Sequence, residues 1–325
     1  MVWGRIAGHT SGMRRAYPIV VAFALAALVL AQPAWGQSRG IEVAVKAEGG
    51  SVETVQLYSQ AYAVIIGIDR YENLPPGSEL SYAVRDAQGV AEVLRRDYAF
   101  DGIATLYNED ATREGILRLL SAELSNTDED DSVFIFWAGH ALTKKTAGHG
   151  DIGYLVPYDG TFDESEMSFK NISMTAIKED IARSVPAKHM FFVFDACYSG
   201  LLVTRALKAL APTRSLAYLR DITGEEVRQV LAAGKADQEV LDGGPRGHSV
   251  FTGRFIEALE EATDYITATE ISTLIKEQVF SDAAARGHAQ TPQGGKLLGL
   301  GDYVFVPRQT AVASAEASRP ALASR

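Results

Sequence analysis

The chain has 325 residues and a formal net charge of −10, and 47% of its residues are hydrophobic. This hydrophobic content supports a sizeable folded core and excludes a wholly disordered chain. The acidic balance argues against a nucleic-acid-binding protein, because neutralising phosphates requires a basic face. It is compatible with basic substrates.

The first 36 residues have the pattern of an export signal. Three arginines are their only formal charges, and an apolar run follows at residues 17–31. Ala34 and Gly36 are small residues placed for cleavage after residue 36. Because the apolar run is short for a membrane span, we predict a cleaved signal peptide and a periplasmic or extracellular protein. An uncleaved membrane anchor is the alternative.

The rest of the chain predicts strands alternating with helices. Residues 37–60 contain β-like runs and predict an N-terminal extension, as a hairpin or an edge strand. Continuous apolar runs typical of buried strands lie at residues 61–68, 132–137 and 189–194. Shorter runs at residues 102–107, 154–156, 229–233 and 303–306 predict further strands. Helical patterns lie at residues 79–98, 112–124, 174–184, 249–262 and 269–280.

This alternation predicts one α/β domain over residues 61–307. The expected architecture is a three-layer α/β/α sandwich around a mostly parallel sheet of six strands. Residues 308–325 are rich in Ala, Ser and Arg and predict a disordered tail.

Cys197 is the only cysteine in the chain, so an intramolecular disulfide is excluded. Three interpretations of the count remain: an inert buried residue, an intermolecular bridge or a reactive thiol. The position of Cys197 favours the last. The runs VFIFWAGH and MFFVFDAC are apolar strands that end just before His140 and Cys197, and ligands bind at this edge of an open α/β sheet.

If the two strands are neighbours, His140 and Cys197 face each other as base and nucleophile. A thiol is mostly protonated near neutral pH and needs an imidazole to accept its proton. The backbone N–H groups of Gly139 and Cys197 are the candidate oxyanion hole.

Several segments in this order resemble the caspase-like cysteine peptidases, in particular the bacterial metacaspase type. They are YAVIIGIDRY, LSYAVRDA, WAGHA, DACYSG, HSVFTGRFIEAL and QTPQ, and the cysteine follows the histidine at an interval of 57 positions. The resemblance implies a caspase-like sheet and hydrolysis of peptide bonds by a Cys–His dyad. It also implies protein or peptide substrates that are cut after Arg or Lys, with Asp86 and Asp195 binding the basic side chain.

One departure from the family pattern leaves alternatives open. Ala141 stands where the family has the second glycine of G-H-G, and alanine disfavours a positive φ. The alternatives are therefore an inactive caspase-like binding or scaffold module and a thiol hydrolase that acts on esters or amides.

No cofactor or metal is assigned from the sequence. Some family members bind calcium, but the acids Asp159, Asp163, Glu164 and Glu166 do not have EF-hand spacing. A basic stretch at residues 203–227 is a hypothetical site of self-cleavage, with an ordinary surface segment as the alternative.

Overall fold

The computed structural model describes residues 40–46, 51–146, 150–196, 205–206, 215–235 and 238–311. The predicted signal peptide, Cys197 and the predicted tail beyond residue 311 lie outside these ranges. Among the described residues, no helix combines the length and the apolar character needed to cross a membrane.

A central sheet organises the described chain, with the strand order β10-β13-β11-β9-β5-β3-β4. Its five parallel strands are β4 (Gly102–Tyr107), β3 (Ala61–Gly67), β5 (Ser132–Ala138), β9 (His189–Asp195) and β11 (Val227–Ala232). Strand β13 (Gln293–Gly299) is antiparallel to β11, and the two-residue β10 (Arg205–Ala206) pairs with β13. The predicted mostly parallel six-stranded sheet is confirmed, and β10 adds a short edge.

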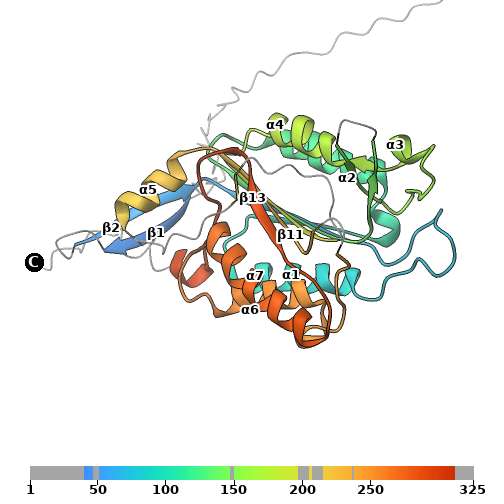
Figure 1. Ribbon diagram of the computed structural model, residues 1–325. Coiled ribbons are helices and arrows are strands. Elements are labelled where there is room, and N and C mark those ends of the chain that lie inside the picture. The colour runs from blue at the N-terminus through green and yellow to red at the C-terminus, as the bar shows by residue number, and fades with distance from the viewer. Residues whose placement is uncertain are drawn as a thin grey trace, which may run out of the picture. The chain divides into compact units, whose positions relative to one another are not determined.

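Helices cover both faces of this sheet (Figure 1). One face carries α1 (Ala83–Asp97), α6 (Val250–Glu261) and α7 (Ala268–Ala285). The other carries α2 (Arg113–Leu117), η2 (Arg118–Glu123), η3 (Leu124–Asn126), η4 (Ala176–Ile181) and α4 (Ala182–Ser184). The predicted three layers are confirmed.

The two helical layers explain why the central strands are apolar at every position. In β5, Phe134 and Phe136 pack into the core beneath α1 and α6. Val133, Ile135 and Trp137 pack into the core on the opposite face. Successive side chains of a strand point to opposite faces, so a strand covered on both sides needs apolar residues throughout.

Smaller elements surround the sheet. Strands β1 (Ile41–Lys46) and β2 (Val52–Tyr58) form an antiparallel hairpin that shares an apolar cluster with α5 (Leu216–Gly224). A three-stranded sheet contains β6 (Ala141–Lys144), β7 (Ile152–Leu155) and β8 (Ile172–Ser173). The remaining short helices are η1 (Asn108–Asp110), α3 (Met167–Lys170) and η5 (Pro245–Gly247).

Several elements differ from the sequence-based prediction. Strand β13 was not predicted from the sequence. The predicted strand at 303–306 is instead β14 (Val304–Phe305), which pairs with β12 (Ile266–Thr267) outside the central sheet. Helix α1 begins at Ala83, because the chain before it turns back and the Leu80 N–H donates to the Asp69 carbonyl. This turn brings Leu80 and Tyr82 to the site described next.

Candidate active site

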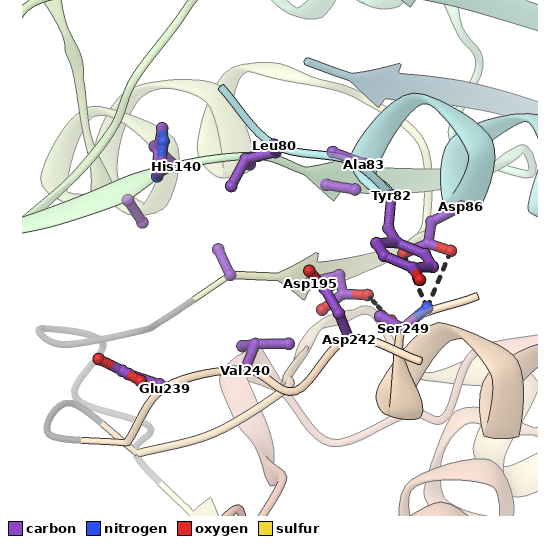
Figure 2. Close-up of a pocket in the computed structure, with 14 residues that line it drawn as sticks. Leu80, Tyr82, Ala83, Asp86, His140, Asp195, Glu239, Val240, Asp242 and Ser249 are labelled. Carbon is purple, nitrogen blue, oxygen red and sulfur yellow. Dashed lines mark hydrogen bonds between the residues drawn. The ribbon is translucent and has the colours of Figure 1, made fainter. Parts of the chain in front are cut away.

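The parallel strands β5 and β9 end level with each other, because Ala138 pairs with Asp195. A pocket of about 250 Å³ opens at this carboxyl edge of the sheet. Figure 2 shows His140 at one end of the pocket and the aspartates grouped around Ser249 at the other. The pocket is lined by Leu80, Tyr82, Ala83, Asp86, Ala138, Gly139, His140, Ala141, Asp195, Ala196, Glu239, Val240, Asp242 and Ser249.

A hydrogen bond to the backbone determines the tautomer of His140. Its Nε2 lies 2.7 Å from the carbonyl oxygen of Ser78, which can only accept. Nε2 therefore carries the proton, and the lone pair of Nδ1 remains as the basic site. Burial lowers the pKa of His140, and the Ser78 carbonyl partly offsets this shift by favouring the protonated ring. The imidazole is thus neutral at neutral pH, as a general base must be.

Tyr71 holds the backbone and the ring of His140. The His140 N–H donates to the Tyr71 hydroxyl at 2.8 Å, and that hydroxyl donates to the Ile68 carbonyl at 3.1 Å. The two rings also stack at a centroid distance of 5.0 Å. On the other side, the ring of Phe162 meets His140 edge-on at 5.3 Å. These contacts leave the imidazole little rotational freedom.

Gly139 occupies a position that has no room for a side chain. Its φ is +157°, and a Cβ at this position would lie 3.0 Å from the Tyr71 hydroxyl oxygen. Its N–H, a predicted oxyanion-hole donor, donates a long 3.4 Å hydrogen bond to the Asp195 carbonyl. The glycine therefore allows Tyr71 to approach His140 closely, and its N–H continues the pairing of β5 with β9.

Asp86 comes from the first turn of α1 and is buried at the back of the pocket. Its Oδ1 accepts from Nδ1 of His248 at 2.8 Å. The Ser249 N–H lies 3.2 Å from Oδ1 and 3.3 Å from Oδ2 (Figure 2). These donors compensate a buried carboxylate for the loss of water.

Asp195 is the last residue of β9 and is only 7% exposed. Its Oδ2 accepts from the hydroxyls of Ser249 and Thr252, each at 2.5 Å. Its Oδ1 is buried and has no hydrogen-bond partner among the described residues. Burial and the nearby charge of Asp86 raise the pKa of Asp195 to about 7. A buried carboxylate oxygen without a donor is costly unless a ligand supplies one.

The predicted site residues His140, Gly139, Asp86 and Asp195 therefore line one pocket. Cys197 lies outside the described residues, and Ala196, which precedes it, lines the pocket. The family model that describes the caspase domain of peptidase family C14 matches residues 60–295.

The chain belongs to the caspase domain family.

A comparison with curated proteins finds no match. Among solved structures, the caspase domain is similar to protein GSU0716 from Geobacter sulfurreducens, with 14% sequence identity and a TM-score of 0.49. That similarity covers 73% of this chain and 93% of the other.

Two carboxylates of this caspase-domain pocket were missed from the sequence. Glu239 and Asp242 follow β11 in a polar stretch with no periodic pattern, so no sequence signal pointed to them. Partial burial and the charges of Asp86 and Asp69 raise the pKa of Asp242. His248 and Ser249, which contact the predicted acids, lie in the HSVFT motif, and this motif was the available signal.

Ala141 causes no local strain in the caspase domain. It lies in β6, where it pairs with Leu155 of β7, and its φ is not positive. The concern that alanine would be forced into a glycine-like conformation therefore does not apply to this geometry.

The acids considered for calcium do not gather into a metal site. Within the described ranges, no three His, Cys, Asp or Glu side chains are arranged to hold an ion. Two of the acids instead serve the local backbone, since Asp159 accepts from the Arg113 N–H and Asp163 accepts from the Ser165 N–H.

Proposed function

We propose that this caspase domain is a cysteine endopeptidase that hydrolyses peptide bonds after Arg or Lys. The observation that supports it is a single pocket that contains both a neutral, oriented His140 and two buried acids, Asp86 and Asp195. Such a pocket offers a general base beside a site for a cationic side chain.

The dyad chemistry uses Nδ1 of His140. His140 follows β5 by two residues and Cys197 follows β9 by two residues, and the two strands end level. Nδ1 accepts the thiol proton, and the thiolate attacks the scissile carbonyl carbon. The imidazolium then gives its proton to the leaving amine, so that a thioester forms as the C–N bond breaks. Water activated by the same nitrogen hydrolyses the thioester and restores the thiol.

Two arrangements are candidates for the oxyanion hole. The N–H groups of Gly139 and Cys197 are the predicted donors, but the Gly139 N–H must give up its 3.4 Å bond to Asp195. The Ala141 N–H is a further candidate. Because the Val156 N–H donates to the His140 carbonyl, strand alternation directs the N–H of Ala141 away from β7.

The substrate side chain is proposed from the charge of the pocket. Oδ1 of Asp195 is buried and finds no donor in the described part of the chain, and Asp86 lies near enough to raise the pKa of Asp195. A guanidinium or ammonium group would supply both the missing donor and the opposing charge. Protein or peptide substrates with basic residues are therefore the proposed partners.

The test is hydrolysis of fluorogenic peptides that end in Arg, Lys or Asp by residues 37–325, with and without calcium. We expect cleavage after Arg and Lys that is lost in Cys197→Ala and in His140→Ala. Cleavage after Asp would retain the peptidase and overturn the acidic pocket. A folded protein that turns over no peptide would favour the binding module, and turnover of simple esters alone would favour the other thiol hydrolase.

The remaining proposals concern processing and location. Residues 1–36 are proposed to be a cleaved export signal, so that residues 37–60 begin the periplasmic or extracellular protein ahead of a peptidase domain at 61–307 and a tail at 308–325. N-terminal sequencing of the exported protein tests the cleavage. Self-cleavage within residues 203–227 remains a hypothesis, and identical fragments from the wild type and Cys197→Ala would contradict it.

A further inference from the structure

Ser249 contacts both acids of the pocket. Its N–H lies 3.2 and 3.3 Å from the two carboxylate oxygens of Asp86, and its hydroxyl donates to Oδ2 of Asp195 at 2.5 Å (Figure 2). Ser249 is itself buried, with 2% of its surface exposed. One residue therefore links an acid from α1 to an acid from β9.

The same hydroxyl caps helix α6. Oγ of Ser249 accepts the Thr252 N–H at 2.9 Å, which makes Ser249 the N-cap of a twelve-residue helix. The positive end of the helix dipole therefore faces the two carboxylates, where it interacts favourably with negative charge. The Thr252 hydroxyl, from the first turn, adds a second donor to Oδ2 of Asp195.

These hydrogen bonds replace part of the water that Asp195 loses on burial, and they also fix the orientation of its carboxylate. Both donors bind Oδ2, so the carboxylate plane is held, and Oδ1 is left without a partner among the residues that the structure describes. Donors to the ionised form also oppose the effect of burial on Asp195, because they favour the carboxylate. Without the Ser249 hydroxyl, Asp195 would be both less ionised at neutral pH and less fixed in position.

We infer that Ser249 is a positioning residue for substrate specificity, which aligns Asp86 and Asp195 for a cationic side chain. This inference rests on the proposed preference for Arg and Lys. It adds a residue that acts through the acids and does not itself contact the substrate's charge.

The test compares Ser249→Ala with Ser249→Thr and Thr267→Ala in the chain 37–325. Thr267 is the matched control, because it is the buried N-cap of α7 and does not line the pocket. The substrates are an arginine peptide and the same peptide with citrulline, a neutral isostere of arginine.

For Ser249→Ala we expect KM for the arginine peptide to rise about tenfold, the scale of losing one hydrogen bond to a charged group, with kcat almost unchanged. The preference for arginine over citrulline should fall by the same factor. The rise of KM on acidification should begin at a higher pH than in the wild type. Ser249→Thr should restore the preference, and Thr267→Ala should lose stability without changing it.

Equal arginine preference in Ser249→Ala and Thr267→Ala would overturn the inference. A wild type that hydrolyses no peptide would contradict the proposed function instead. The positioning role of Ser249 is then tested by calorimetric titration of the wild type and Ser249→Ala with acetyl-arginine amide. Binding that weakens about tenfold in Ser249→Ala would support the positioning role without catalysis. No binding by the wild type, or equal binding by both proteins, would contradict it.

Discussion

At the scale of single residues, the pocket holds the carboxylate of Asp195 in surroundings that disfavour its charged form. Asp195 is buried and lies near a second acid, and one of its carboxylate oxygens has no hydrogen-bond partner within the described ranges. Because its folded-state pKa is raised, its contribution to stability is full at acidic pH and is lost as the pH rises through about 7. The fold therefore gives up stability at neutral pH to hold this charge, which is a common feature of functional sites.

The first prediction is that acid weakens the binding of basic substrates before it stops catalysis. As the pH falls through about 7, Asp195 gains a proton and no longer attracts a guanidinium. The pKa of His140 is lowered, so the base stays neutral further into acid. We expect KM for arginine peptides to rise between pH 8 and 6 while kcat holds, measured by steady-state kinetics.

Asp195→Asn serves as the control for this experiment. It should have a high KM for arginine peptides that no longer changes over this pH range. A KM that is flat in the wild type would contradict the prediction, as would a slope that persists in Asp195→Asn.

The second prediction concerns the orientation of the base. Tyr71→Phe keeps the ring that stacks on His140 but removes the hydroxyl that accepts the His140 N–H. We expect kcat to fall about tenfold and KM to stay constant, because the loss of one hydrogen bond leaves the imidazole less well aligned. The measurement is kcat and KM on an arginine peptide.

Tyr62→Phe is the matched control, since its hydroxyl donates to Oε1 of Gln60 away from the pocket. The role assigned to Tyr71 would be rejected if both variants lost kcat equally, or if Tyr71→Phe changed only KM.

At the scale of elements, a buried arginine hydrogen-bonds the backbone carbonyls at the C-terminal end of α4. Arg228 of β11 donates to the carbonyls of Ala182, Val185 and Lys188 at 2.6, 3.0 and 3.0 Å. The last carbonyls of a helix have no partners within it, so a side chain must supply donors where water is excluded. This contact joins the helical layer to the sheet.

The third prediction is that Arg228→Met destabilises the fold without affecting specificity. It leaves several buried carbonyls unpaired, and we expect a loss of about 3 kcal/mol in the free energy of unfolding. Urea denaturation measures it. Arg183→Met is the control: it breaks only an exposed ion pair with Glu179 and should cost less than about 0.5 kcal/mol. Similar losses in the two variants would contradict this account.

Element boundaries were predictable from the sequence where the pattern was local. Strands β3, β5 and β9 were predicted because burial on both faces imposes continuous apolar runs, and β4 and β11 were predicted from shorter runs. Strand β13 was missed because its sequence, QGGKLLG, has three glycines, which weaken a strand signal. The start of α1 was placed too early, since the turn before it is fixed by Asp69, a contact between separate parts of the chain.

At the scale of the whole molecule, His189 joins four segments beneath the amino end of the sheet. Its Nδ1 accepts from the Tyr58 hydroxyl at 2.8 Å, and its Nε2 donates to the Glu225 carbonyl at 3.0 Å. The Tyr58 hydroxyl in turn accepts the Val304 N–H. Burial lowers the pKa of His189 to about 3, so the folded protein keeps it neutral.

The fourth prediction follows from this lowered pKa. The unfolded chain binds a proton below about pH 6.5 that the folded chain excludes, so stability falls as the pH drops from 6.5 towards 3. Between pH 7.5 and 5 the loss from this group is about 2 kcal/mol. We expect His189→Gln to be less stable at pH 7.5 and to have a flatter pH dependence, measured by urea unfolding. Parallel pH profiles for the two proteins would contradict this.

Part of the site could be predicted residue by residue, but the contacts between its residues could not. His140, Asp86 and Asp195 were predicted from motifs and family resemblance, and they line one pocket. The Ser249 bridge and the carboxylates of Glu239 and Asp242 depend on how distant segments pack. Cys197, the predicted nucleophile, remains a prediction.

The residues that line the pocket come from the parts of the sequence before and after residues 207–214. Asp86, His140 and Asp195 precede this stretch, Ser249 follows it, and β9 pairs with β11 across it along six residues. A cut there would yield two polypeptides, each with only part of the pocket, held together by the sheet and the shared apolar core. They should migrate together under native conditions and separate only in denaturant. Recovery of activity after denaturation would then depend on protein concentration for the nicked form, as for a heterodimer, and not for the intact chain.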